Sequence, residues 1–307
     1  MAANVYSKKI SAEQAAMLKE YFEKNSTLYE MGALNYGIFK AKGDGLIVSA
    51  YNSGKLVVQG KNMAEFIQFV LEPQILQEVS FGYETELMLE NFLPHAGVDE
   101  SGKGDFFGPL VISAVFLDEN SARKLIELGV ADSKSIKNPK KMLELAKEIK
   151  KECYEHCSVI TIGNIAYNRM YNSFKNLNKL LAWGHAKSIE NMLEKTPQCQ
   201  VVISDQFARN KNVIKSALME KGRQIELRQM HKAESDIAVA AASVLARATF
   251  VTQLNRISEQ LGFELPLGCS SKVKDVALKI AQDKGVEVLD GVIKQHFKTR
   301  LEVLKLL

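Results

Sequence analysis

Residues 96–117 read AGVDESGKGDFFGPLVISAVFL, and two adjacent carboxylates in this stretch lie between two apolar runs. The short run AGV precedes Asp99 and Glu100, and the longer run LVISAVFL follows a loop with three glycines. This order predicts a strand, a glycine loop and a second strand. Because glycine has no Cβ, the loop can bring backbone N–H groups and the Lys103 ammonium close to a phosphate or a ribose hydroxyl. The stretch is therefore a candidate site around which the rest of the chain is organised.

Simpler interpretations of the same residues remain open. The glycine spacing G-x-G-x-x-x-G does not fit the dinucleotide fingerprint, and the loop lacks the upstream glycine of a P-loop, so a nucleotide-cofactor site is disfavoured. An Asp-Glu pair at a strand end is, taken alone, more often a solvated turn than a metal site. Buried carboxylates, however, are costly unless they are paired, hydrogen-bonded or metal-bound, and this pair directly follows apolar residues. From the residues alone, the two interpretations are about equally good.

The run DESGKGDFFGPLV at residues 99–111 closely resembles the first active-site block of type 2 ribonucleases H, and its Gly-Lys-Gly form is similar to the ribonuclease HIII branch. The resemblance continues in ADSK at 131–134, ISDQF at 203–207, KAE at 232–234 and AVAAASVLAR at 238–247, and covers about residues 94–300. It implies an α/β fold with a ribonuclease H-like mixed sheet flanked by helices. It also implies an endonuclease that hydrolyses the RNA strand of RNA/DNA hybrids and leaves 3′-hydroxyl and 5′-phosphate ends.

Four carboxylates are the candidate catalytic residues and metal ligands. Phosphodiester hydrolysis requires stabilisation of charge on the phosphate oxygens and a deprotonated water, and two divalent ions held by carboxylates can supply both. Magnesium or manganese suits such oxygen ligands. The resemblance assigns Asp99, Glu100, Asp205 and Glu234 to this role. Adjacent strand residues point to opposite faces, so Asp99 and Glu100 can converge only if the strand ends or bends at the glycine loop.

The fourth acid is ambiguous because Glu234 and Asp236 are two residues apart. Alignment of Lys-Ala-Glu with the Lys-Ala-Asp block of the family favours Glu234, with Asp236 as the alternative ligand. The glutamate departs from the aspartate of the ribonuclease HII branch, although it is similar to the ribonuclease HIII branch. Its longer side chain leaves the ligand geometry open.

Recognition of a hybrid depends on the 2′-hydroxyl, which is the group that distinguishes RNA from DNA. The resemblance implies that Ser101, Gly102, Lys103 and Gly104 bind the substrate. It also favours a phosphate contact for Lys134, although a lysine-rich loop is by itself equally typical of a solvated face. Two other functions are considered: cleavage at single ribonucleotides in duplex DNA, as in ribonuclease HII, and hybrid binding without catalysis. A binding protein would need the lysines but not four acids.

A chain of 307 residues with 46% hydrophobic content suits two domains with sizeable cores. Helical periodicity at 12–24 and 63–71 encloses three apolar runs that are separated by Gly-Asp-Gly and Asn-Ser-Gly, which are hairpin signals. We predict a small α+β domain over residues 1–85 and a catalytic domain over residues 86–307. The resemblance implies that the first domain has a fold similar to the TATA-binding protein and assists substrate binding.

Charge counting does not support that role for the first domain. Residues 1–85 contain eight lysines, no arginine and nine acids, about −1 in total, whereas the remainder carries about +5. This composition predicts no basic stripe, so Tyr36, Phe39 and Lys40 would contact the hybrid through shape. Deletion of the domain would then weaken binding but change its salt dependence little.

The chain shows no run of 18 apolar residues and no leader pattern, so we expect a cytoplasmic protein without membrane insertion or secretion. The spacing Cys153-x-x-x-Cys157 with His156 between the cysteines invites a zinc interpretation, but a second ligand pair with suitable spacing is missing from the sequence. Reduced cysteines fit better. The expected partner is the RNA/DNA hybrid, with no obligate protein partner indicated.

Overall fold

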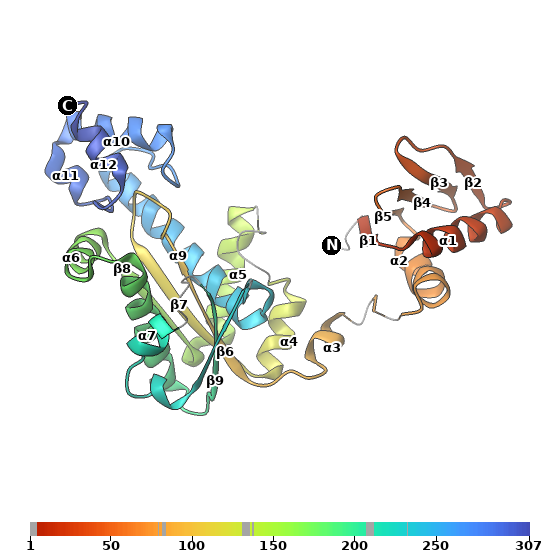
Figure 1. Cartoon of the computed structure of the whole chain (residues 1–307), viewed down its shortest axis with the longest axis horizontal. Helices are drawn as coiled ribbons and strands as arrows, with labels where there is room; N and C mark the ends of the chain where they lie inside the picture. Colours follow the sequence, from red (N-terminus) through yellow and green to blue (C-terminus); the bar gives the residue numbers. More distant parts are fainter. Residues whose placement is uncertain are drawn as a thin grey trace. The chain divides into compact units, whose positions relative to one another are not determined.

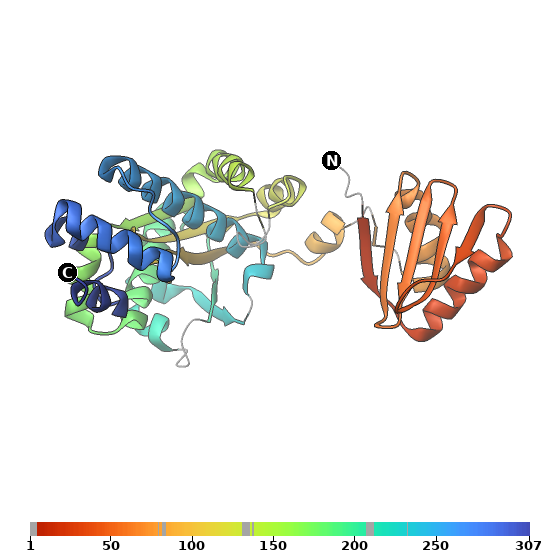
Figure 2. The ribbon, with the colours of Figure 1, turned by 90° about the horizontal axis from the view of Figure 1, so that it is seen from above.

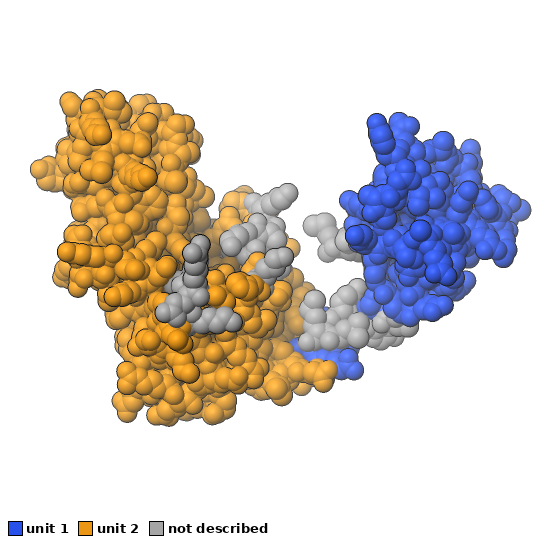
Figure 3. All heavy atoms as spheres, in the orientation of Figure 1, with its two compact units in different colours: residues 1–90 blue, residues 91–307 orange. Residues whose placement is uncertain are grey.

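The computed structural model describes residues 5–78, 80–81, 84–130, 136, 138–206, 212–231 and 233–307. The chain divides into two compact units, residues 1–90 and 91–307 (Figure 3). This division lies a few residues after the boundary predicted from the sequence. Each unit has its own hydrophobic core, and each is therefore described separately.

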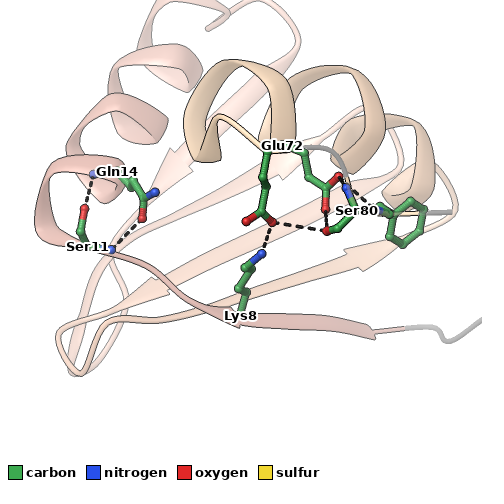
Figure 4. A network of polar contacts seen from close by, with 7 residues as sticks. Lys8, Ser11, Gln14, Glu72 and Ser80 are labelled. Carbon is green, nitrogen blue, oxygen red and sulfur yellow. Dashed lines mark hydrogen bonds and ion pairs between the residues drawn. The ribbon is translucent and has the colours of Figure 1, made fainter. Parts of the chain in front are cut away.

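The first unit is a five-stranded antiparallel sheet covered on one face by helices (Figure 4). Alternate strand residues such as Phe39 and Val48 are buried against these helices, which explains the apolar positions of the predicted hairpins. The strands in spatial order are β1 (Val5–Lys9), β5 (Lys55–Gly60), β4 (Leu46–Tyr51), β3 (Gly37–Gly43) and β2 (Tyr29–Gly32). The helices are α1 (Ala12–Lys24), α2 (Met63–Phe66) and the π-helix η1 (Ile67–Leu76), followed by α3 (Glu84–Leu89).

Polar contacts fix the start of α1 and the segment that follows η1 (Figure 4). The Ser11 hydroxyl accepts from the Gln14 N–H at 3.0 Å, and the Gln14 side chain accepts from the Ser11 N–H at 2.9 Å, which completes a capping box and explains why α1 begins there. Buried Glu72 accepts hydrogen bonds from the backbone N–H groups of Ser80 and Phe81 at 2.7 and 2.9 Å. The predicted second helix differs from the structure, because α2 continues as η1 past Pro73 to Leu76.

The second unit contains a mixed sheet in the order β10-β9-β6-β7-β8 (Figure 1). The two predicted strands of the opening motif are β6 (His95–Ser101) and β7 (Leu110–Leu117), which pair antiparallel. β6 also pairs parallel with β9 (Val201–Asp205), and β9 pairs parallel with β10 (Glu226–Met230). β8 (Cys157–Ile162) pairs antiparallel with β7. The predicted mixed α/β fold is confirmed.

Helices cover both faces of this sheet, so every residue of β7 is buried. Leu110 and Ile112 pack in a core with α7 (Leu177–Lys195), whereas Val111 packs in a core with α9 (Ile237–Leu261). Figure 2 shows α4, α5 and α9 together on one side of the sheet. The remaining elements are α4 (Glu119–Glu127), α5 (Pro139–Glu152), η2 (Tyr154–His156), α6 (Asn164–Phe174), α8 (Asn212–Ala217), η3 (Gly222–Gln224), η4 (Ala233–Ser235), α10 (Ser271–Lys284), α11 (Val286–Asp290) and α12 (Lys298–Leu304).

Helix α9 is long and apolar enough to span a membrane by length and composition, the one such helix among the described residues. However, 67% of its most apolar window is buried, and it packs against β6 and β7. It is therefore the central helix of a folded domain. Its alanines allow this packing, because Ala238, Ala241 and Ala242 are fully buried without large side chains that would separate helix and sheet.

Candidate active site

The glycine loop begins where β6 ends. Its first two glycines, Gly102 and Gly104, have different structural roles. β6 continues one residue past the acidic pair to Ser101, and Gly102 then takes a φ of +92°. A Cβ on Gly102 would also lie 2.3 Å from the carbonyl oxygen of Pro109, so the turn excludes other residues. Gly104 is exposed, with no atom within 4 Å of a Cβ position, which leaves its backbone open to a ligand.

A cavity of about 470 Å³ lies beside this loop and gathers most of the predicted site residues. Three of the four predicted acids line it, and so do all four predicted substrate-binding residues of the glycine loop. The lining residues are Asp99, Glu100, Ser101, Gly102, Lys103, Gly104, Asp105, Asp205, Ser243, Arg247, Phe250, Val251 and Leu267.

The strand register explains why two aspartates from distant parts of the sequence meet here. β6 and β9 are parallel neighbours in which Val98 pairs with Ser204, so the next residue on each strand is an aspartate, Asp99 or Asp205. Ligands of α/β sheets gather beyond the carboxyl ends of such strands. Asp205 ends β9 and accepts a weak hydrogen bond from the Ala233 N–H at 3.5 Å.

Asp99 is held on the α9 side of the sheet. Its Oδ1 accepts from the Glu100 N–H at 2.8 Å, and its carboxylate also bonds to the Ser243 side chain of α9. Burial raises the pKa of Asp99 to about 7, and the nearby Glu100 charge acts in the same direction.

Glu100 is held from the opposite side by a histidine that sequence reasoning missed. The Nε2 of His185 on α7 lies 2.8 Å from Glu100 Oε2, and the Lys103 ammonium lies 3.4 Å from Oε1. Burial alone would raise the pKa of Glu100, but the His185 contact, assisted by Lys103, outweighs it and lowers the pKa. The other ring nitrogen, Nδ1, lies 3.4 Å from the Ser204 hydroxyl, so His185 connects β6 to β9. A single histidine on an apolar helix gave no signal in the sequence.

The two candidates for the fourth acid have different surroundings. Asp236 is the N-cap of α9: its Oδ1 accepts from the N–H groups of Ala238 and Val239 at 2.9 and 3.1 Å, and its Oδ2 lies 2.8 Å from His95 Nε2. These contacts occupy both oxygens of Asp236. Glu234 is half-buried on η4, beside Ala233, whose N–H bonds to Asp205. Glu234 does not line the cavity, so its role as a ligand stays a prediction.

The donor set fits a hard divalent cation, because the three acids that line the cavity offer carboxylate oxygens. Within the described ranges, no three Asp, Glu, His or Cys side chains are gathered closely enough to form a ready metal site. The zinc interpretation of Cys153 and Cys157 finds no support in that part of the chain either. Lys134, the predicted phosphate contact, lies outside the described residues.

The open face of the sheet in the first unit corrects the expectation of no basic stripe. Strand alternation places four lysines and one glutamate on the face that the helices leave uncovered, and Phe39 on the buried face, where it cannot contact substrate. The net charge of the unit does not reveal this separation of lysines from acids, because the acids of α1, α2 and η1 lie on the helix side of the sheet. The charged residues of this open sheet face are Lys9, Glu30, Lys40, Lys42 and Lys55.

Comparisons with known proteins agree with both units. Residues 96–300 match the family model described as Ribonuclease HII, and residues 7–79 match a model described as a domain of unknown function, DUF3378. The chain is 46% identical over 264 residues to ribonuclease HIII of Protochlamydia amoebophila, covering 86% of this chain and 85% of the relative. It is 40% identical over 295 residues to ribonuclease HIII of Chlamydia caviae, covering 96% and 95%.

Solved structures resemble the whole chain. The crystal structure of Bst-RNase HIII in complex with Mn²⁺ has a TM-score of 0.67 and 26% identity, and the match covers 98% of both chains. The crystal structure of Aquifex aeolicus RNase H3 has a TM-score of 0.54 and 26% identity, covering 94% of this chain and 98% of the other.

Proposed function

This chain belongs to the ribonuclease HII family, in its ribonuclease HIII branch, and from that premise we propose that it cleaves the RNA strand of RNA/DNA hybrids by a two-metal-ion mechanism. The products are a 3′-hydroxyl and a 5′-phosphate. The observation that carries the proposal is the meeting of Asp99, Glu100 and Asp205 with the glycine loop in one cavity.

Asp99, Glu100 and Asp205 hold the divalent ions, Mg²⁺ or Mn²⁺, with Glu234 as the fourth ligand. Bound there, the ions supply charge stabilisation on the phosphate oxygens and an activated water. His185 and Ser243 fix the directions of Glu100 and Asp99, so both carboxylates are oriented before the substrate arrives. Lys103 favours the binding of a phosphate, because its ammonium lines the same cavity and lies 3.4 Å from Glu100 Oε1.

The glycine loop reads the ribose. Gly104 leaves its backbone uncovered, and Gly102 turns the chain so that residues 101–104 border the acidic cavity. Backbone groups at this position can hydrogen-bond a 2′-hydroxyl, which a DNA strand lacks. Discrimination between RNA and DNA then occurs next to the scissile bond.

The first unit binds the hybrid through its open sheet face. Four lysines and one glutamate give this face a positive balance, which favours contact with the phosphate backbone. Tyr36 follows β2 and is 90% exposed, so it is available for a stacking or sugar contact near the edge of the same sheet. The domain assignment, a substrate-binding unit and a catalytic unit, rests on this surface and on the cavity.

The test is cleavage of end-labelled RNA/DNA, RNA/RNA and single-ribonucleotide duplexes, each with magnesium or manganese. We expect cleavage of the RNA/DNA hybrid with 3′-hydroxyl ends. Products with 2′,3′-cyclic ends would contradict a metal-activated water as nucleophile, because such ends form when the ribose hydroxyl attacks. Preferred cleavage at a single ribonucleotide would instead support the ribonuclease HII-like function.

Substitution of the acids separates catalysis from binding. Asp99→Asn and Asp205→Asn should each lower kcat at least about 100-fold, because a ligand charge worth several kcal/mol is lost with little change in volume. Hybrid binding measured in EDTA should change little. Asp118→Asn is the matched control, since Asp118 caps α4 and asparagine is an equally good cap. Normal turnover by folded Asp99→Asn at saturating magnesium would refute the assignment.

A further inference from the structure

The segment that follows α11 is bound to the second half of the glycine loop, residues 105–108. The Gly108 N–H donates to the carbonyl of Val292 at 3.0 Å, and the Lys294 N–H donates to the carbonyl of Phe106 at 2.8 Å. Phe107 and Ile293 form an isolated antiparallel bridge between these contacts. Residues 292–294 therefore act as a short strand beside residues 106–108, although the two segments are far apart in the sequence.

The side chain of Lys294 adds a buried cationic centre to this junction. Lys294 is 0% exposed, and its Nζ donates to the carbonyls of Gly108 at 2.6 Å, Asp105 at 2.9 Å and, at 3.4 Å, Phe107. The rings of Tyr167 and Phe250 lie 5.6 and 5.9 Å from the same nitrogen. Aromatic faces at this distance stabilise a cation.

Three carbonyl acceptors match an ammonium group, which has three hydrogens to donate, whereas a neutral amine has only two. Burial lowers the pKa of Lys294 to about 7, and the Asp105 carboxylate opposes this shift. The carbonyls favour the charged form in the same way as Asp105. The other titratable groups near the ammonium are Tyr167 and His296, and burial followed by the Lys294 charge lowers the pKa of His296.

We propose that Lys294 is the positioning residue of the glycine loop: its buried side chain binds the carbonyls of residues 105, 107 and 108 and so fixes the backbone that presents residues 101–104 to the ribose. The inference rests on the proposed function, because it assigns substrate reading to that loop. Phe250 supports the connection, since this ring contacts Lys294 and also lines the acidic cavity.

Other side chains and backbone groups hold the same part of the loop. The Asn164 side chain donates to the same Gly108 carbonyl at 2.8 Å from α6, and on the other side the Asp105 carboxylate accepts from the Gly268 N–H at 2.6 Å. The segment 105–108 is thus held from three directions by groups distant in sequence. Loops that must present backbone groups to a substrate require such support, because a displacement of about 1 Å can cost about 100-fold in rate.

The test compares Lys294→Met with two other variants. Lys294→Met keeps an unbranched side chain but removes the charge and the donors, and Asn164→Leu loosens the same Gly108 carbonyl more mildly. Arg300→Met is the matched control, because Arg300 forms a two-bond ion pair with Asp290 at 2.7 and 2.6 Å in the same carboxyl-terminal region without contacting the loop. The measurements are KM and kcat on one RNA/DNA hybrid, hybrid affinity in EDTA, thermal unfolding, and amide exchange of residues 106 and 108.

Lys294→Met should raise KM and weaken hybrid affinity about 10-fold or more. Asn164→Leu should change both quantities less. Arg300→Met should change neither, even where it lowers Tm as much as Lys294→Met does. Amide exchange at residues 106 and 108 should accelerate in the first two variants only. A folded Lys294→Met protein with wild-type KM and exchange overturns the proposal, as does an equal rise of KM in Arg300→Met. If Lys294→Met does not fold, Asn164→Leu decides in the same way. If the wild-type protein does not cleave hybrids, the proposed function fails, and amide exchange still tests the contact of Lys294 with the loop.

Discussion

Replacing Gly97 with alanine is expected to destabilise the second unit and to slow catalysis, because this glycine allows α9 to lie directly on the central strand. Gly97 pairs with Val115 on one side and with Ile203 on the other, so β6 cannot move within the sheet without breaking a ladder. A Cβ on Gly97 would lie 2.1 Å from Val239 N and 2.2 Å from Ala238 C, both backbone atoms of α9.

The size of the effect follows from these distances. Van der Waals contact requires the α9 backbone to retreat by about 1 Å, and a backbone cannot evade the methyl group by changing a rotamer. Overpacking of this kind costs about 3 kcal/mol or more, a large part of the about 5–15 kcal/mol that stabilises a typical domain. The retreat also affects the site. Gly97 and Asp99 lie on the same face of the sheet. On α9, Ser243 lies one helical turn after Val239. If α9 retreats at Val239, Ser243 therefore moves away from Asp99 and their hydrogen bond opens.

The assay is urea unfolding followed by circular dichroism, together with kcat on an RNA/DNA hybrid. We expect a lower unfolding midpoint and a kcat reduced at least about 10-fold. Gly163→Ala is the control, because no atom lies within 4 Å of its Cβ position. A Gly97→Ala protein whose free energy of unfolding and kcat both match those of Gly163→Ala would refute the packing argument.

Three further predictions follow from contacts elsewhere. Burial lowers the pKa of His95, but the bond to Asp236 outweighs it and raises the pKa, so His95 contributes stability below pH 6.5 that is lost as the pH rises through the raised value. Urea unfolding from about pH 5 to 8 should show this loss in the wild type and not in His95→Gln. His185→Asn should weaken Mn²⁺ binding, measured by calorimetry, about 10- to 100-fold, and unchanged affinity would remove His185 from the site. Replacing the four lysines of the open sheet face with glutamine should reduce the slope of log affinity against log salt by about 3, whereas Lys19→Gln with Lys24→Gln on α1 should leave it unchanged.

Local patterns in the sequence predicted the positions of the acids at the strand ends, but not the positions of the helix residues that contact them. Asp99, Glu100 and Asp205 follow or end apolar runs, so their position at strand ends was predictable, and the motif blocks favoured them over a solvated turn. The positions of His185 and Ser243 could not be read in this way, because each acts across the sheet from a helix. The lack of a sequence signal has a physical cause: a polar residue inside an apolar helix face looks the same whether its partner is a backbone group or a catalytic carboxylate.

The sequence by itself determined the strand–glycine loop–strand motif, the hairpins of the first unit and the helix α1. These features depend on periodicity, caps and turns, which act over a few neighbouring residues. The tertiary structure decided the rest. Only the β6–β9 register brings Asp99 beside Asp205. Only the pairing of the strands gathers the lysines of β1, β3 and β5 on one face of the first unit. Only chain folding places Lys294 under the glycine loop. Each of these is a long-range pairing, and residues that are remote in sequence carry no local trace of the partner they will meet.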